Sequence, residues 1–160
     1  MDDVATTPPV EASTDIDAGP IADASPIGQT DAGACAEARS VSFGGHCYFP
    51  LTSRGSWMAA STSCQASGAH LVTIGSAEEQ TAVAAIAVTQ DRWMGLTRPA
   101  NALPTAGSYA WITGEAFGYA HWGNGEPNFT GECVRMVQAG TWADNPCTTS
   151  YYAVCERETL

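Results

Sequence analysis

The stretch WGNGEPNFTGECVRMVQAGTW, residues 122–142, is the most informative part of this sequence. At its centre, Glu126 and Asn128 flank Pro127, and a second carboxylate, Glu132, follows shortly after. Carboxylate and amide oxygens are the ligands that hard cations such as calcium prefer. The same residue types also build ordinary surface turns. The stretch alone therefore leaves two interpretations open, a cation site and a plain polar loop.

The residues that follow extend the same chemistry. Trp142 is followed closely by Asp144 and Asn145, which are further oxygen donors. Cys133 and Cys147 bracket this later part. The candidate cation ligands are thus spread over two segments of the sequence.

Charge is distributed unevenly along the 160 residues, whose formal net charge is −11. Residues 1–33 carry seven acids and no base, whereas residues 34–160 carry ten acids and six arginines, and lysine is absent. Without a basic patch, binding to nucleic acid or to an anionic membrane surface is not expected. No apolar run long enough to cross a membrane occurs, so we predict no membrane insertion by this chain.

Six cysteines and three isolated histidines argue against a transition-metal site. The cysteine spacings contain no C-x-x-C pair, and the histidines show no metal-binding spacing. An even number of cysteines without a metal pattern indicates disulfides, and therefore an oxidising, extracytoplasmic compartment at the cell surface or outside the cell. Sequence alone leaves fifteen possible pairings.

Composition divides the chain into two parts. Residues 1–33 contain four prolines, no aromatic residue and only isolated aliphatic residues. Such a segment buries too little apolar surface to offset its ordering entropy, so we predict a disordered acidic tether. It resembles the spacers of bacterial surface lipoproteins, although an ordinary disordered terminus is the alternative. Residues 34–160 are predicted to form one folded domain.

Within that domain, the patterns predict two helices and many short strands. Ser56 is a candidate N-cap for a helix that stops at Gly68, and Ser76 opens a second helix with Glu79 in capping-box spacing and a body of TAVAAIAVT. Expected strands are 41–43, 47–49, 71–74, 93–96, 133–137, 140–142 and 151–155. This order favours an α+β fold over a parallel βαβ design. Three tryptophans are expected in the core: Trp57, Trp93 and Trp111.

Taken in order, these motifs resemble the C-type lectin-like domain. The segments that carry the resemblance are HLVTI, the Glu-Glu helix, WMGL, YAWITGE, HWGNGEPN, ECVRM, W-x-D-x-x-C and YYAVCE. The match covers about Cys35 to Glu158. It implies two helices, a lower antiparallel sheet, and a long loop region over a small upper sheet. It also implies three disulfides, which are Cys64–Cys155, Cys133–Cys147 and Cys35–Cys47.

The resemblance also implies a ligand set. In calcium-dependent members, Glu-Pro-Asn contributes two ligands about a proline that is usually cis, and it goes with mannose-type sugars, whereas Gln-Pro-Asp goes with galactose. The implied metal ligands here are Glu126, Asn128, Glu132, Asp144 and Asn145. The implied carbohydrate-binding residues are Glu126, Asn128, Glu132, Asp144 and Phe129. Tyr151 is a further candidate to stack on a sugar, with plain packing as the alternative for both aromatic residues.

Two departures from the family pattern reduce the expected ligand count. Ala143 stands where the family has a ligand asparagine, and Asn145 could replace it only after a backbone shift. Glu132 directly precedes Cys133, whereas the family places this glutamate two positions ahead of the cysteine. Residues 97–110 contain no acid, so an auxiliary calcium site is not expected. We therefore predict one Ca²⁺ at most, bound weakly.

The preferred function is a calcium-dependent module that binds mannose-type sugars (mannose, fucose, glucose, N-acetylglucosamine) through vicinal hydroxyls coordinated to one Ca²⁺. The alternative is a calcium-independent domain that recognises a protein or another surface. A hydrolase using Glu126 and Glu132 as a carboxylate pair is the third hypothesis. We predict that the protein is not an enzyme, because the sequence offers no activated nucleophile or catalytic histidine partner and the family is not catalytic.

Overall fold

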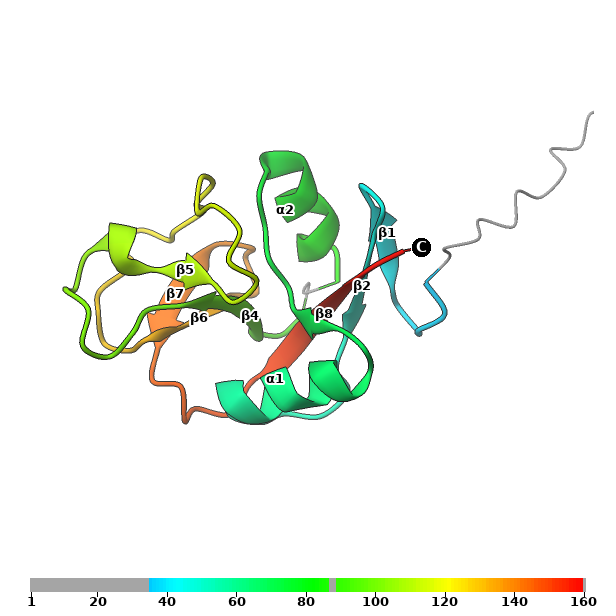
Figure 1. Ribbon diagram of the computed structural model, residues 1–160, viewed down its shortest axis with the longest axis horizontal. Coiled ribbons are helices and arrows are strands. Elements are labelled where there is room, and N and C mark those ends of the chain that lie inside the picture. Colours follow the sequence, from blue (N-terminus) through cyan, green and yellow to red (C-terminus); the bar gives the residue numbers. More distant parts are fainter. Residues whose placement is uncertain (1–34, 87–88, 160) are drawn as a thin grey trace, which may run out of the picture.

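The computed structural model describes residues 35–86 and 89–159. Figure 1 shows two helices on either side of a sheet, with irregular loops at the end far from the β1–β2 hairpin. The predicted tether, residues 1–33, lies outside the described residues. None of the helices in the described part of the chain is both long and apolar enough to cross a membrane.

The base of the domain is a sheet of antiparallel strands with a helix on each side. β1 (Val41–Phe43) and β2 (His46–Pro50) form a hairpin, and β8 (Tyr152–Glu158) pairs with β2 and with β3 (His70–Leu71). Gly44 and Gly45 both have positive φ, which the two-residue hairpin turn requires.

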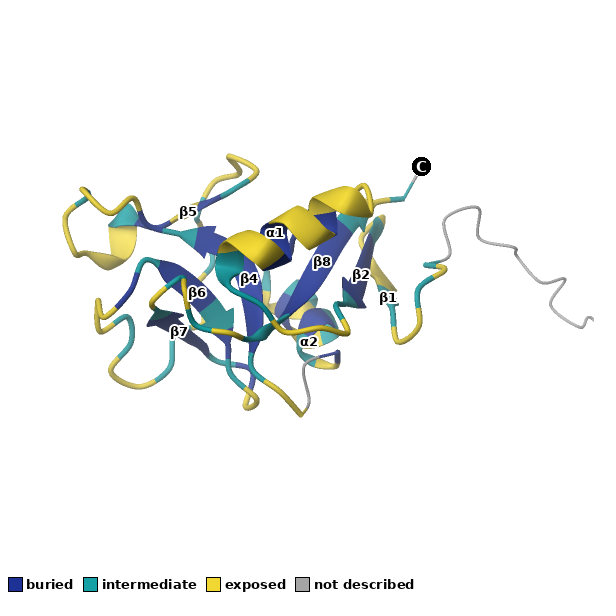
Figure 2. Ribbon diagram, turned by 90° about the horizontal axis from the view of Figure 1, so that it is seen from below, coloured by how far each residue is buried: buried dark blue, intermediate teal, exposed yellow. Residues whose placement is uncertain are grey.

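Both helix starts agree with the sequence prediction. α1 (Trp57–Ala66) begins after Ser56, whose side chain accepts a hydrogen bond from the Ala59 N–H. α2 (Ala77–Ala84) begins after Ser76, whose side chain accepts from the Glu79 N–H. These caps satisfy N–H groups that have no partner within the helix. Figure 2 shows the outer face of α1 exposed and the face toward β8 buried.

A second group of strands carries the long loops. β4 (Arg92–Thr97) pairs in parallel with β8 and antiparallel with β5 (Ala110–Trp111) and β6 (Cys133–Met136). β6 pairs with β7 (Trp142–Asn145), and the short helix η1 (Ala106–Ser108) precedes β5. The two groups form one mixed sheet in the order β1-β2-β8-β4-β6-β7.

The three disulfides join the pairs that the family resemblance implied. Cys64–Cys155 links α1 to β8, and Cys133–Cys147 links β6 to the segment after β7. Cys35–Cys47 fixes the start of the described chain to β2. The α+β class and the predicted disulfide set are therefore confirmed.

Several predicted boundaries were wrong. Only the first residue of the predicted 71–74 strand is in β3, because Val72–Ile74 continues as a buried segment outside the ladder. The predicted strand at 140–142 is displaced to 142–145, because Gly140 adopts φ 91° in the turn before it. α2 ends at Ala84, well before the end of the alanine-rich run, and residues 87–88 lie outside the described residues.

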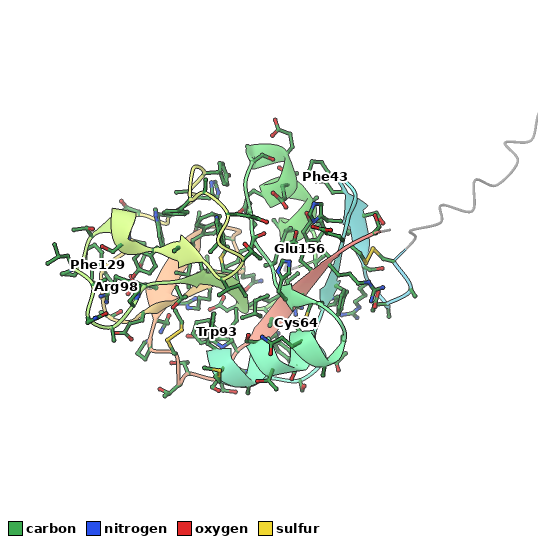
Figure 3. All side chains as sticks on the ribbon, viewed as in Figure 1. Phe43, Cys64, Trp93, Arg98, Phe129 and Glu156 are labelled. Carbon is green, nitrogen blue, oxygen red and sulfur yellow. A yellow bond between two sulfur atoms is a disulfide. The ribbon has the colours of Figure 1, made fainter. Side chains whose placement is uncertain are left out.

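The core includes two of the three predicted tryptophans, since Trp93 and Trp111 are buried and Trp57 is half-buried. Glu156 is also buried, at 1% exposure, and it accepts hydrogen bonds from the Thr73 N–H and hydroxyl. Its other oxygen lies 2.8 Å from His46 Nδ1, so this histidine, isolated in the sequence, meets a buried carboxylate. Figure 3 shows Glu156 at the centre of the domain, remote from Phe129.

Candidate functional site

The candidate site lies on the long loop between β5 and β6, residues 112–132. This loop joins β7 through an isolated bridge between Trp122 and Trp142. The N–H of Gly123 donates to the carbonyl of Trp142, and the N–H of Trp142 donates to the carbonyl of His121. Aromatic rings pack edge-on around fully buried Trp142, which fixes this part of the loop on the upper strands.

Asp144 is the residue around which the tip of the loop folds. It lies on β7 and is 2% exposed. Its carboxylate accepts backbone N–H groups from Asn128 at 2.7 Å, Phe129 at 3.1 Å and Gly131 at 2.9 Å. Phe129 adopts φ 61°, an uncommon conformation for a residue with a side chain. Hydrogen bonds to a charged acceptor are stronger than neutral ones, so they compensate for this backbone geometry.

Glu126 and Asn128 face each other about a cis Glu126–Pro127 peptide bond. The Asn128 side-chain amide donates to Glu126 Oε1 at 3.0 Å, and its backbone N–H donates to Glu126 Oε2 at 3.2 Å. Burial and the adjacent Asp144 carboxylate raise the pKa of Glu126 above its usual range. Two carboxylates and one amide therefore converge, with like charges held close together, an arrangement that a bound cation would stabilise.

Gly131 explains how the loop approaches β7 so closely. A Cβ atom placed on Gly131 would lie 1.9 Å from the backbone carbon of Asn145, a distance that no side chain can occupy. The absence of a side chain lets the Gly131 N–H reach Asp144. The residue is therefore required by a backbone contact and makes no ligand contact itself.

The carboxylate of Glu132, a predicted ligand, lies near an arginine and makes no hydrogen bond to the cluster within the described residues. Its carboxylate is 39% exposed and lies 3.7 Å from Nη2 of buried Arg98. Its backbone carbonyl accepts the Arg98 N–H and the Thr97 hydroxyl, which holds it to the end of β4. No hydrogen bond joins it to Glu126, Asn128 or Asp144 among the described residues.

Asn145 and Ala143 also contribute no oxygen to the cluster. Asn145 Oδ1 accepts from Arg135 Nε at 2.6 Å, so its carbonyl is directed to β6. Arg135 in turn pairs with Asp91. Ala143 is buried in β7 and has no side-chain donor atom. Of the five predicted ligands, the structure brings together Glu126, Asn128 and Asp144.

The two aromatic candidates lie in different places. Phe129 is 38% exposed at the tip of the loop, next to the oxygen cluster. Tyr151 packs edge-on against Trp93, with ring centroids 4.9 Å apart, and lies under the Arg135 guanidinium. Phe129 therefore stays a candidate for contact with a sugar, whereas Tyr151 packs in the domain.

The oxygen cluster matches the chemistry of calcium only in part. Carboxylate and amide oxygens are the correct donors, but calcium takes six to eight of them. Within residues 35–86 and 89–159, no three His, Cys, Asp or Glu side chains are placed to share a metal. The site thus consists of two carboxylates and one amide, and the remaining positions would be filled by backbone oxygen, water or ligand hydroxyls.

Sequence reasoning missed three features of this site. Arg98 lies beside the Glu132 carboxylate, but it is distant from Glu132 in sequence and no local pattern indicated this contact. Asp144 was predicted as a ligand, but its role as acceptor for the loop backbone was not, because such contacts depend on the loop conformation. The left-handed backbone conformation of Phe129 was not predicted either, because no glycine stands at this position to indicate it.

A domain of two helices, a mixed sheet and three disulfides, with an oxygen-rich long loop, has the architecture of a C-type lectin-like domain. A family model described as the lectin C-type domain matches residues 53–157. The chain belongs to this family of binding domains. C-type lectin domain family 4 member G from Homo sapiens is 34% identical over 121 residues, covering 73% of this chain and 41% of that protein. The chain therefore spans less than half the length of this relative.

Two solved structures differ in ligand chemistry although both resemble this fold. The cow C-type carbohydrate-recognition domain of CD23, in the presence of GlcNAc2Man3 oligosaccharide, has a TM-score of 0.70 and 30% identity, covering 80% of this chain and 98% of that one. A calcium-independent type II antifreeze protein has a TM-score of 0.68 and 28% identity, covering 79% of this chain and 96% of that one. The fold therefore accommodates sites of different chemistry, and the residues of the site must decide between them.

Proposed function

We propose that this domain binds one calcium ion through Glu126, Asn128 and Asp144, and a mannose-type sugar at the same place. The observation that supports the proposal is the convergence of these three side chains about the cis Glu126–Pro127 bond. No arginine in the described residues forms an ion pair with Glu126 or Asp144, so the charge of these two adjacent carboxylates favours a bound cation. The structural relative crystallised in the presence of a mannose-containing oligosaccharide supports the same assignment.

Each residue has a distinct part in the proposed recognition. Calcium, when bound, supplies coordination positions for two neighbouring sugar hydroxyls. Glu126 accepts a hydrogen bond from one hydroxyl, and the Asn128 amide, released from Glu126 Oε1, donates to the other. Asp144 holds the backbone of residues 128–131 in place, so the loop is already folded before any ligand arrives. Phe129 offers an exposed ring beside the sugar position.

Weak binding follows from the small number of ligands. Because affinity depends on ligand charge and number, we expect a calcium Kd of roughly 10⁻⁴ to 10⁻³ M, as in other extracellular modules. A single shallow site of this kind gives useful avidity only when several copies are displayed together. We propose that the domain is secreted or held at a cell surface, with residues 1–33 as its tether, and that it acts without catalysis.

Retention on immobilised mannose and galactose tests the proposal. We expect retention on mannose in calcium and elution by a chelator, with little retention on galactose. Glu126→Gln should abolish retention, whereas Glu115→Gln, which removes one charge from an exposed position on the same loop, should not. Combining Glu126→Gln with Asn128→Asp creates the tripeptide that the family associates with galactose, and should move retention to that resin.

A calcium-independent recognition domain is the second candidate. The observation that favours it is the saturation of Asp144 by backbone N–H groups, which holds the loop without an ion. A structural relative is also calcium-independent. This candidate predicts a melting temperature that does not change on addition of calcium, whereas binding of calcium to the folded state alone must raise it.

A further inference from the structure

The arginines fall into two groups that the sequence does not separate. Three of the six are paired with acids, as Arg98–Glu132, Arg135–Asp91 and Arg157–Glu37. The other three, Arg39, Arg54 and Arg92, form no ion pair with any acid in the described ranges. They belong to three separate segments of the chain, so their relationship appears only in the fold.

These three arginines gather near Tyr152. The guanidinium carbons of Arg92 and Arg54 lie 5.4 and 5.6 Å from the centroid of the Tyr152 ring. Arg92 begins β4 and is paired across the parallel ladder with Tyr152 itself. Burial, together with the nearby charge of Arg39, lowers the pKa of Arg92 from its usual range. Like charges are therefore brought together where no acid offsets them within the described residues.

Arg92 is the feature that points to a ligand. It is 6% exposed, and its buried Nε and Nη1 atoms have no hydrogen-bond partner within residues 35–86 and 89–159. Arg98 is equally buried and its Nε also lacks a partner among the described residues, but its Nη1 donates to the Ala102 carbonyl and its Nη2 lies 3.7 Å from the Glu132 carboxylate. Arg92 has neither kind of contact with any described residue. Stacking on Tyr152 contacts the face of the Arg92 guanidinium and leaves its N–H edge without an acceptor. Buried charged donors of this kind are costly unless a partner is supplied.

The surroundings of Arg92 provide room for such a partner. It lines two hollows of about 440 and 450 Å³, and both are also lined by Arg39 and Thr89. The first hollow adds the polar side chains of Thr52 and Gln90. The space is therefore bounded by two positive charges together with hydroxyl and amide groups.

We propose that the first hollow, which Thr52 and Gln90 also line, binds an oxyanion group, a carboxylate or a sulfate. The N–H groups of Arg92 would donate to the anion, and the charge of Arg39 would attract it. Planar guanidinium groups match such anions with paired N–H donors. The hollow lies at a different place from the long loop, residues 112–132. Arg92 begins β4, whereas Arg98, which lies beside Glu132 at the end of the long loop, follows the other end of that strand. The net charge of −11 repels anions at long range, so affinity depends on contact with these arginines.

The same surroundings indicate what carries the anion. The hollow is far larger than a single oxyanion, and Thr52, Thr89 and Gln90 offer hydrogen bonds suited to a hydroxylated molecule. A sugar bearing a carboxylate therefore fits better than an inorganic ion. Glucuronate should bind more tightly than sulfate, and glucose, which has the ring without the charge, should not bind.

The test is a titration of the full chain followed by the NMR signals of the arginine Nε–H groups. The protein is freed of calcium on a chelating resin, because a soluble chelator is itself a polycarboxylate, and ionic strength is held constant with sodium chloride. Glucuronate, sulfate and glucose are the three probes. We expect the Arg92 Nε–H signal to shift with glucuronate and sulfate and to stay unchanged with glucose.

Variants identify the groups responsible. Arg92→Met keeps the bulk of the side chain and should weaken glucuronate binding by about tenfold or more. Arg39→Gln, at an exposed position, should weaken it several-fold without loss of folding, so it tests the proposal even if the Arg92 variant is unstable. Arg157→Gln removes the same charge from a pair with Glu37 and should leave the affinity unchanged.

Three outcomes are decisive. Binding of glucuronate and sulfate that needs Arg92 or Arg39 supports the oxyanion site, and their relative affinity shows whether a sugar ring contributes. Binding that survives both variants, or that falls equally in Arg157→Gln, overturns it. Equal responses to glucuronate and glucose also overturn it. None of these results depends on calcium or mannose, so they leave the proposed function untouched.

Discussion

Two buried carboxylates, Asp144 in the long-loop region and Glu156 in the base, organise their surroundings in different ways. Asp144 is 2% exposed and binds the backbone of three residues in one irregular segment. Glu156 is 1% exposed and joins Thr73 to His46, from two segments already placed around β8. Regular strand pairing holds the base, and the hydrogen bonds of Glu156 add to that pairing. The long loop has almost no strand pairing, and the hydrogen bonds to Asp144 hold its backbone instead.

This contrast bears on function, because a segment that lacks a ladder can change its sequence at little cost to the fold. The residues beside Asp144 can therefore vary between an ion site and other chemistry while the base stays the same. Relatives with similar overlap include both a carbohydrate-recognition domain crystallised in the presence of an oligosaccharide and a calcium-independent protein. The difference between the two regions should be measurable as a difference in how each one loses stability.

Removing disulfides should have the largest effect and should separate the regions. Cys64 and Cys155 are 91 residues apart, so replacing both with alanine should cost about 4–5 kcal/mol of unfolding free energy in the chain-entropy picture. Cys133 and Cys147 are 14 residues apart, and the same replacement should cost about 3 kcal/mol. Denaturant unfolding of both double variants measures this. A greater loss from the Cys133–Cys147 pair would contradict the order expected from the lengths of the two closed loops.

The next effect is expected at Asp144. Asp144→Asn should cost about 3 kcal/mol, because hydrogen bonds to a charged acceptor become neutral ones and an amide hydrogen faces a backbone donor. Amide hydrogen exchange should show the loss of protection first at Phe129 and Gly131, while β8 stays protected. Uniform loss of protection over the whole domain would mean that the loop and base are one cooperative unit.

A smaller effect, of opposite sign, is expected at Ala143. Ala143→Asn restores an oxygen donor at the position where the family has one, and should tighten calcium binding by about tenfold, which is about 1.4 kcal/mol. Ala143→Leu adds similar bulk without the oxygen and serves as the control. Calcium-dependent shifts in melting temperature compare the two. An asparagine variant with the same response as the leucine variant would show that this position does not reach the ion.

The smallest effect concerns the pH dependence of Glu156. Burial raises its pKa above the usual value of 4.5, against the hydrogen bonds from Thr73 and the charges of His70 and His46. A carboxyl group whose pKa is raised in the folded state contributes its full stabilisation at pH values below its pKa in the unfolded chain. This contribution is lost as pH rises through its pKa in the folded protein. Glu156→Gln should therefore gain stability relative to the wild type as pH rises from about 4.5 toward neutrality. Parallel curves of unfolding free energy against pH would contradict this.

Local signals were sufficient for the helix starts and failed wherever the contact partner was distant. Ser56 and Ser76 cap helices through residues three positions away, and both were predicted correctly. The boundaries of β3 and β7 were missed, since neither the buried segment after Leu71 nor the turn at Gly140 depends on residue type alone. The disulfide pairs came from the family resemblance, because spacing leaves them open.

The site shows the same division. The family resemblance implied that Glu126 and Asn128 are two ligands about a proline that is usually cis, and the structure has the cis bond and a hydrogen bond between the two side chains. Glu132 and Arg98 lie far apart in sequence, and only the fold shows that they meet. The arginines around Tyr152 were missed for the same reason, since the sequence shows six scattered cations and no basic run.

The most direct test of the proposed calcium-dependent lectin site is a calorimetric titration of calcium with and without mannose. We predict a single calcium site with a Kd of roughly 10⁻⁴ to 10⁻³ M. Saturating mannose should lower this Kd, because a sugar that binds more tightly in the presence of calcium must strengthen calcium binding by the same factor. Glu126→Gln should remove both the calcium signal and its coupling to mannose, and Glu115→Gln should preserve them. A protein that shows no calcium binding over this range, or binds calcium with the same affinity whether or not mannose is present, would contradict the proposal.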